Sequence, residues 1–267
     1  MPRVSVIMSV YNTNDIDILK QCVQSVRTQT MEDFEMIICD DGSTDGTYEL
    51  LSKVCAGDDR IRLIRNEQNM MAAAARNRCI SQAVGEYVAV MDADDYSSRE
   101  RLEVQTNFLD EHPEWDFVGS GAALFDERGI WGYRHYASSP DKKDFRFVLP
   151  FVHASVMFRR KALDTVKGYR HAWETIRNED YDLFLRMYAA GLRGVNLPNV
   201  LYYVREDKAT FVRRKYRYRW NEMAVRYRGF KAMGLLPAAL PYVVKPAVVG
   251  LIPHRLLEKL KDLYYHR

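Results

Sequence analysis

The chain has 267 residues, a net charge of +3 and an apolar fraction of 47%, values typical of a soluble α/β protein with a substantial core. Its cysteines argue against a disulfide framework or a zinc site, because Cys22, Cys39, Cys55 and Cys79 form no Cys-x-x-Cys pair and fall within predicted helices or strands. The first residues run directly into an apolar strand, so we expect no export signal and a cytoplasmic protein with reduced thiols.

The charge is unevenly distributed along the chain. Residues 206–267 carry 14 Lys or Arg and 5 Asp or Glu, a surplus of nine positive charges, which leaves residues 1–205 with a net charge of −6. No low-complexity linker or internal repeat interrupts the first part. We therefore predict one domain over 1–205 and a basic, helical tail over 206–267.

Strands and helices alternate through the first half. Apolar runs predict strands at 4–11, 35–39, 61–64 and 87–91, and apolar residues at helical spacing predict helices near 19–26, 48–55, 72–83 and 99–111. Helices between successive strands indicate right-handed crossovers, hence a mainly parallel α/β sheet flanked by helices. Beyond residue 115 the pattern is less regular, with strands expected at 117–120, 154–158 and 201–204 and a helix around 181–188.

Acidic residues follow two of these strands where each strand ends. Asp40 and Asp41 come after one, and Asp92, Asp94 and Asp95 come after another. Ligands of open α/β sheets bind at the carboxyl ends of the strands. Clustered carboxylates repel one another unless a cation or a hydrogen-bonding ligand holds them. The pattern predicts a nucleotide together with Mg²⁺ or Mn²⁺, although an acidic turn of this kind can also be only a solvated loop.

The loop after Asp41 has two simpler readings. It has calcium-loop residues at some positions, but Ser52 stands where a bidentate Glu is required, which excludes calcium. A strand-to-helix turn capped by Ser43 or Asp45 explains the rest of the loop. Asp41 is left unexplained by that turn, and it suits recognition of a nucleobase or ribose.

Five motifs in order give the chain a family resemblance over residues 3 to about 205. They are Val4 to Asn12, Asp40 to Thr47, Ala75-Arg76-Asn77, Asp92-Ala93-Asp94 and Asn178 to Leu183. Together they resemble the family 2 glycosyltransferases, which are inverting enzymes with the nucleotide-sugar-binding GT-A fold. The resemblance implies a role for each of seven residues: base and ribose contacts from Ser9, Tyr11 and Asp41; a diphosphate contact from Arg76; metal binding by Asp94, with Asp92 beside it or on the ribose; and a catalytic base in Asp180.

Asp180 also has a structural explanation. Acids at the start of a helix are favoured by the helix dipole alone, and Glu179 and Asp182 lie within the same turn. As the base, Asp180 would accept a proton from the attacking hydroxyl of the acceptor, and a single displacement of the nucleoside diphosphate would invert the anomeric centre.

The sequence departs from the family pattern at two places. Family members often carry glycine before and shortly after the Ala-Arg-Asn motif, where this chain has Met71 and Cys79. Processive synthases of the superfamily carry a Gln-x-x-Arg-Trp motif, and the comparable stretch at 217–220 lacks the Gln. This difference favours the addition of a single sugar.

Several further residues stand near the expected acceptor side. His153 precedes a predicted strand and is more readily explained as a hydrogen-bonded structural residue than as a catalytic one. Aromatic residues cluster between the predicted strands, and they suit either sugar stacking or cover of the core: Trp131, Tyr133, His135 and Tyr136.

The tail predicts a membrane surface as partner. Nine Lys or Arg between 208 and 231 alternate with aromatic residues, and the following segment, 234–252, is apolar except for Lys245. Nucleic acid is a weaker partner for such a sequence and is not expected. Three prolines make a spanning helix unsuitable, so we expect an anchor on an anionic membrane surface, at the inner face of the plasma membrane. The alternative is a helical tail packed on the body.

These features lead to three hypotheses of function. The first is a metal-dependent inverting glycosyltransferase that moves a sugar from a nucleotide-sugar, expected to be a UDP-sugar, to a hydroxyl of a glycan or lipid-linked glycan in surface polysaccharide biosynthesis. The second is a sugar-phosphate nucleotidyltransferase, which should show a Gly-rich, Arg-containing loop after the first strand, where this chain has Tyr11 to Asp15. The third is a non-catalytic nucleotide-sugar or lipid-binding protein.

Overall fold

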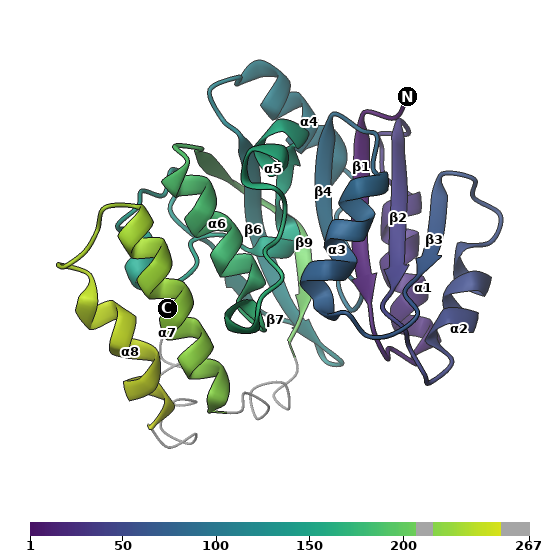
Figure 1. The fold of residues 1–267 in the computed structure, drawn as a ribbon. Helices are drawn as coiled ribbons and strands as arrows, with labels where there is room; N and C mark the ends of the chain where they lie inside the picture. Colours follow the sequence, from purple (N-terminus) through teal and green to yellow (C-terminus); the bar gives the residue numbers. More distant parts are fainter. Residues whose placement is uncertain (207–215, 252–267) are drawn as a thin grey trace.

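The computed structural model describes residues 1–206 and 216–251 (Figure 1). Among these, the strands form one sheet in the order β3-β2-β1-β4-β8-β6-β9-β5, and β7 pairs with β6 beside that path. The strands are β1 (Val4–Val10), β2 (Phe34–Asp40), β3 (Ile61–Arg65), β4 (Tyr87–Asp92), β5 (Tyr96–Ser97), β6 (Phe117–Asp126), β7 (Gly129–Arg134), β8 (Met157–Arg159) and β9 (Gly194–Arg205).

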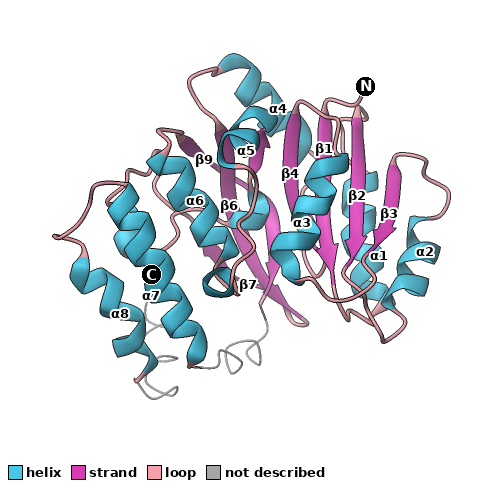
Figure 2. Cartoon of the chain, in the orientation of Figure 1, coloured by secondary structure: helices cyan, strands magenta, loops and turns pink. Residues whose placement is uncertain are grey.

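Helices cover both faces of the sheet (Figure 2). One face packs against α1 (Ile16–Arg27), α2 (Thr47–Cys55) and α4 (Arg101–Glu111), and the other packs against α3 (Met71–Gln82), α5 (Arg160–Val166) and α6 (Glu179–Ala189). Alternation along β1 produces the two layers, because Val6 and Met8 enter one core and Ile7 enters the other. Short 3-10 helices lie at Asp144–Arg146, His153–Ser155 and Trp173–Thr175.

The first half of the sheet is parallel, as predicted. β1 pairs in parallel with β2 and β4, and β2 pairs in parallel with β3. Ser9 stands opposite both Cys39 and Asp92, so the two acidic loops emerge at the same edge. The second half is mixed: β8 is antiparallel to β4 and β6, whereas β6 and β9 are parallel.

The predicted strand at 154–158 is wrong in its first half. Residues His153–Ser155 form a 3-10 turn, and β8 begins only at Met157. The Ser155 hydroxyl donates to the Val152 carbonyl at 2.8 Å and accepts from Ser120 N at 3.1 Å, which holds the turn against β6. The sequence prediction also missed β5, β7 and α5, which are short.

Two helices follow the sheet, α7 (Arg217–Ala232) and α8 (Leu240–Gly250), which confirms the helical character predicted for the tail. Buried Val225 and Phe230 of α7 and Val243 of α8 share a core with α6. α7 lies so close to α6 that a Cβ at Gly229 would come within 2.6 Å of the Leu185 side chain. No helix in the described ranges is long and apolar enough to cross a bilayer.

Candidate active site

A cavity of about 420 Å³ lies beyond the carboxyl end of β4, beside the start of α6. Most of the predicted catalytic groups meet there, since Arg76, Asp92 and Asp180 all line it. The rest of its wall comes from Asp95, Arg134, Tyr136, Val148, Leu149, Phe151, Val152, His153, Ala154, Arg177, Glu179 and Val204.

Arg76 links the two acidic segments of the cavity. Its guanidinium donates to Asp92 Oδ1 at 2.8 Å and to Glu179 Oε1 at 3.3 Å, and it lies over the Tyr169 ring. The side chain is buried, and burial lowers its pKa, but the charges of Asp92 and Glu179 outweigh burial and raise that pKa. A fixed positive charge therefore holds the end of β4 next to the start of α6.

The three acids after β4 have different surroundings. Asp92 is partly exposed, and Arg76 lowers the pKa of its carboxyl against the opposing effect of burial. Asp95 is buried, where it accepts from Arg205 N at 2.8 Å; burial, and then the nearby charges of Asp94 and Asp92, raises its pKa. Asp94 is exposed. Asp95 is therefore part of the structure that fixes the turn, and it leaves Asp92 and Asp94 as the two carboxylates accessible to ligands.

Two carboxylates suit a metal that arrives with a nucleotide. Within the described parts of the chain, no group of three or more Asp, Glu, His or Cys is arranged to hold a metal by itself. Mg²⁺ and Mn²⁺ take one or two carboxylates and fill their other positions with water and substrate phosphate. Asp92 and Asp94 fit that mode of binding, and they do not fit an all-protein metal cage.

The predicted nucleotide side lies at the ends of β1 and β2. Asp41 is buried, and its Oδ1 accepts from Asn66 Nδ2 at 2.6 Å and from Met70 N at 2.9 Å. Ser9 is partly exposed and Tyr11 is 46% exposed. Asp41 thus orients the 66–70 loop, whereas the Tyr11 ring presents an open face on which a base can stack.

Glycine is required next to Asp41. Gly42 has a φ of +71°, and a Cβ there would lie 2.5 Å from the Gln68 carbonyl carbon. Met71 has a φ of +70°. A glycine expected from the family pattern is therefore replaced by a residue that keeps the left-handed backbone at a steric cost.

The start of α6 distinguishes its three acids. Asp182 is buried between Arg170, at 2.7 Å, and Arg186, at 2.6 Å, so its carboxylate is used to hold the helix. Glu179 faces Arg76. Asp180 is partly buried, lines the cavity, and accepts from Tyr181 N at 2.7 Å, so it lies at the positive end of the helix dipole.

His153 and Tyr169 form a buried pair behind Arg76. The His153 Nε2 and the Tyr169 hydroxyl are 2.7 Å apart, and burial, aided by the charge of Arg76, lowers the histidine pKa to about 3. The ring is neutral at ordinary pH. This geometry matches the structural role that the sequence favoured for His153.

Two cavity residues were not found by sequence reasoning. Arg134 lies at the end of β7 and pairs with Glu206 at 2.6 Å, and Arg177 precedes the start of α6 with a φ of +66°. Arg177 is exposed at the cavity wall. Its position directly before the Asn-Glu-Asp motif was the available signal. Of the aromatic cluster, Tyr136 lines the cavity, and the Tyr133 and His135 rings stack at 6.4 Å.

Two family models match this chain. Residues 5–167 match the glycosyl transferase family 2 model, and residues 87–257 match the glycosyl transferase family group 2 model. The chain belongs to glycosyl transferase family 2. This membership confirms the predicted family and decides against the nucleotidyltransferase alternative.

Two curated relatives of this family 2 glycosyltransferase extend the match. A Bacillus subtilis protein named as the glycosyltransferase EpsE is 38% identical over 267 residues, which cover 100% of this chain and 94% of the relative. WfaP of Escherichia coli, named as a UDP-Glc:alpha-D-GlcNAc-diphosphoundecaprenol beta-1,3-glucosyltransferase, is 31% identical and covers 76% of this chain and 78% of the relative.

Solved structures confirm the predicted GT-A fold. TarS 1–349 of S. aureus, in complex with UDP-GlcNAc, aligns with a TM-score of 0.71 at 20% identity over 92% of this chain and 73% of TarS. The mannosyltransferase PcManGT from Pyrobaculum calidifontis, in complex with GDP-Man and Mn²⁺, aligns with a TM-score of 0.62 at 20% identity over 98% of this chain and 79% of that chain.

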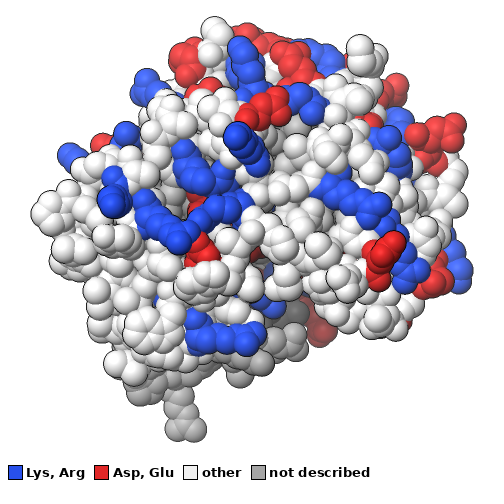
Figure 3. Space-filling model, in the orientation of Figure 1, with Lys and Arg blue, Asp and Glu red and all other residues white. Residues whose placement is uncertain are grey.

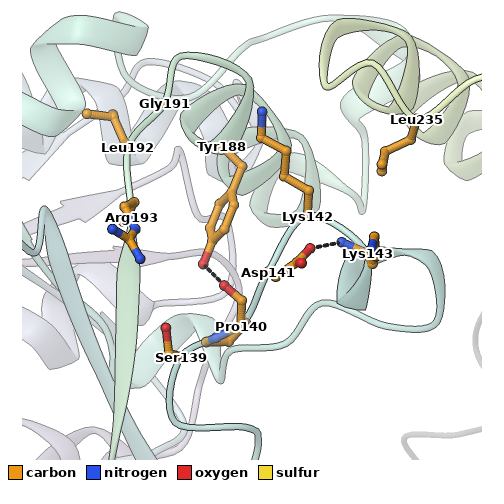
Figure 4. A pocket seen from close by; sticks show the side chains of 10 residues that line it. All are labelled: Ser139, Pro140, Asp141, Lys142, Lys143, Tyr188, Gly191, Leu192, Arg193 and Leu235. Atoms are coloured by element: carbon orange, nitrogen blue, oxygen red, sulfur yellow. Dashed lines mark hydrogen bonds between the residues drawn. The ribbon is translucent and has the colours of Figure 1, made fainter.

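A second cavity of the transferase, of about 430 Å³, lies at the other end of α6 (Figure 4). Lys142, Lys143 and Arg193 line it, and the Tyr188 hydroxyl donates to the Pro140 carbonyl at 2.9 Å at its wall. The residues predicted as donor, metal or base ligands are not part of its lining. The candidate active site is therefore the cavity at Arg76 and Asp180.

Proposed function

We propose that this protein is a metal-dependent, inverting glycosyltransferase that moves one sugar from a UDP-sugar to a hydroxyl of a lipid-linked glycan, in the synthesis of a cell-surface polysaccharide. The carrying observation is the cavity that joins Arg76, Asp92 and Asp180 at the carboxyl edge of a GT-A sheet. UDP-GlcNAc in TarS and the diphosphoundecaprenol acceptor named for WfaP support the donor and acceptor classes. The inner face of the plasma membrane is the proposed location, with attachment at the surface.

In the proposed donor complex, Ser9 and Tyr11 hold the base, and Asp41 holds the base or ribose. Asp92 and Asp94 would hold Mn²⁺ or Mg²⁺, which when bound offsets the negative charge of the diphosphate. Mn²⁺ in the PcManGT complex supports this cofactor. Arg76 keeps Asp92 in place and supplies a further positive charge close to the diphosphate.

Asp180 is proposed as the base because of its place in the cavity. Asp182 is enclosed by two arginines, and Glu179 is paired with Arg76. Asp180 accepts the acceptor's proton as the acceptor oxygen attacks the anomeric carbon, and the bond to the nucleoside diphosphate breaks on the opposite side. One displacement inverts that centre.

A donor screen tests this proposal. Thermal unfolding of the full chain is followed with UDP-, GDP- and dTDP-sugars, with and without Mn²⁺, because a ligand that binds only the native state raises the unfolding temperature by mass action. We expect stabilisation by a UDP-sugar that depends on Mn²⁺. Stabilisation by none of these donors, with or without metal, would reject the proposal.

A further inference from the structure

The exposed side of α8 and of the turn before it is entirely apolar. Its exposed residues, here called the α8 face, are Pro237, Ala238, Leu240, Pro241, Val244, Val248 and Leu251. The four larger aliphatic residues recur at helical spacing and are 44% to 75% exposed: Leu240, Val244, Val248 and Leu251. Single exposed apolar residues are ordinary, but a contiguous apolar helix face marks an interaction site.

The only charged residue of α8 turns away from this face. Lys245 Nζ donates to the Phe147 carbonyl at 2.9 Å and lies 5.9 Å from the centre of the Phe147 ring. Burial lowers its pKa. In Figure 3 the surface over α8 is correspondingly white, while basic side chains gather next to it.

Cations and aromatic rings form a stripe on the neighbouring helix. The exposed residues of α7, here called the α7 stripe, are Arg217, Trp220, Tyr227, Arg228 and Lys231, with small Ala232 at its end. Glu222, the acid of this helix, turns inward to Arg219 and Arg226. The stripe therefore presents positive charge and aromatic rings without an opposing carboxylate on α7.

We propose that the α8 face and the α7 stripe together form the surface by which the protein docks on an anionic lipid bilayer. Aliphatic residues beside a basic-aromatic stripe are typical of interfacial membrane segments, in which the aliphatic side enters the acyl boundary and the cations meet anionic head groups. A second copy fits less well, since a twofold contact through this surface would bring like charges together.

The surface continues to the mouth of the active-site cavity. The Phe147 ring lies 5.0 Å from the Tyr242 ring of α8, and Phe147 and the neighbouring cavity residue Val148 are 55% and 46% exposed. A bilayer on the α8 face would thus lie beside the rim of the cavity that contains Asp180. This step rests on the proposed function, because it gives a membrane-held acceptor a short path to the base.

Vesicle binding of the full chain tests the docking surface. The probes are vesicles of equal parts phosphatidylglycerol and phosphatidylcholine, and vesicles of phosphatidylcholine alone. The double variant Val244→Gln, Val248→Gln should bind the anionic vesicles at least about tenfold more weakly, because two aliphatic side chains no longer enter the acyl boundary. Val84→Gln is the matched control: Val84 is 52% exposed between α3 and β4 and should leave binding unchanged.

The basic stripe has its own variant. Arg217→Gln with Lys231→Gln should weaken binding to the anionic vesicles by about fivefold per residue and leave binding to phosphatidylcholine unchanged. Unchanged vesicle binding in the Val244, Val248 double variant would overturn the proposal. So would a wild-type dimer in light scattering that this variant dissociates while vesicle binding persists, since the occupant would then be a second copy.

Transfer of a sugar to a soluble acceptor separates this inference from the proposed function. The Val244, Val248 double variant should transfer to a soluble acceptor like the wild type and lose transfer to a lipid-linked acceptor in vesicles. A wild-type protein that binds anionic vesicles but transfers no sugar to either acceptor would reject the proposed function and still support the docking surface.

Discussion

His153 should make the stability of this protein depend on acid in a predictable way. In the unfolded chain the imidazole takes up a proton near pH 6.5, whereas in the folded protein its pKa is about 3. Between these values the unfolded state binds more protons, so stability is complete above about pH 6.5 and is lost as the pH falls toward 3. Each pH unit in this window costs about 1.4 kcal/mol, so the loss from pH 6.5 to pH 4.5 is about 3 kcal/mol.

The test compares urea unfolding of the wild type and of His153→Gln at the two pH values. Gln can still hydrogen-bond to the Tyr169 hydroxyl but does not titrate. The variant should lose about 3 kcal/mol less than the wild type on acidification, and the contributions of other groups cancel in this difference. His112→Gln, at an exposed site, should behave like the wild type. Equal losses in wild type and His153→Gln would refute the reasoning.

Three further changes have expected outcomes. Met71→Gly should raise the free energy of unfolding by about 1 kcal/mol, because glycine adopts a φ of +70° without the steric cost, whereas Met70→Gly, at a φ of −101°, should lower it; equal urea midpoints would contradict this. Gly42→Ala should lower stability by at least about 2 kcal/mol because of the contact with Gln68, and an unchanged midpoint would be inconsistent with the loop geometry. Asp94→Ala should abolish transfer and remove the Mn²⁺ dependence of UDP binding in calorimetry; retained dependence would move the metal elsewhere.

Regular alternation made the first half of the fold predictable. The apolar runs of β1, β2 and β4 are buried on both faces, so their sequences carry a strong strand signal and end at the acids. The second half depends on tertiary contacts. β8 is three residues long, and the turn before it is held by Ser155 and its partners on β6, which no local pattern reveals.

The site was predictable in its acids and not in their partners. Position after a strand or at a helix start singled out Asp92 and Asp180. The sequence does not show that Asp182 is enclosed by Arg170 and Arg186, because Arg170 reaches it from a separate loop. The cavity position of Arg134 depends in the same way on the pairing of β7 with β6.

The most direct test of the account is the Asp180→Asn variant, measured for both donor binding and turnover. Asn is nearly isosteric with Asp but cannot accept the acceptor's proton. We expect UDP-sugar affinity to stay within about twofold of the wild type while turnover falls by about two orders of magnitude or more. Near-normal turnover would contradict the assignment of the base, and Glu179→Gln, measured in parallel, would then show whether its neighbour carries that role.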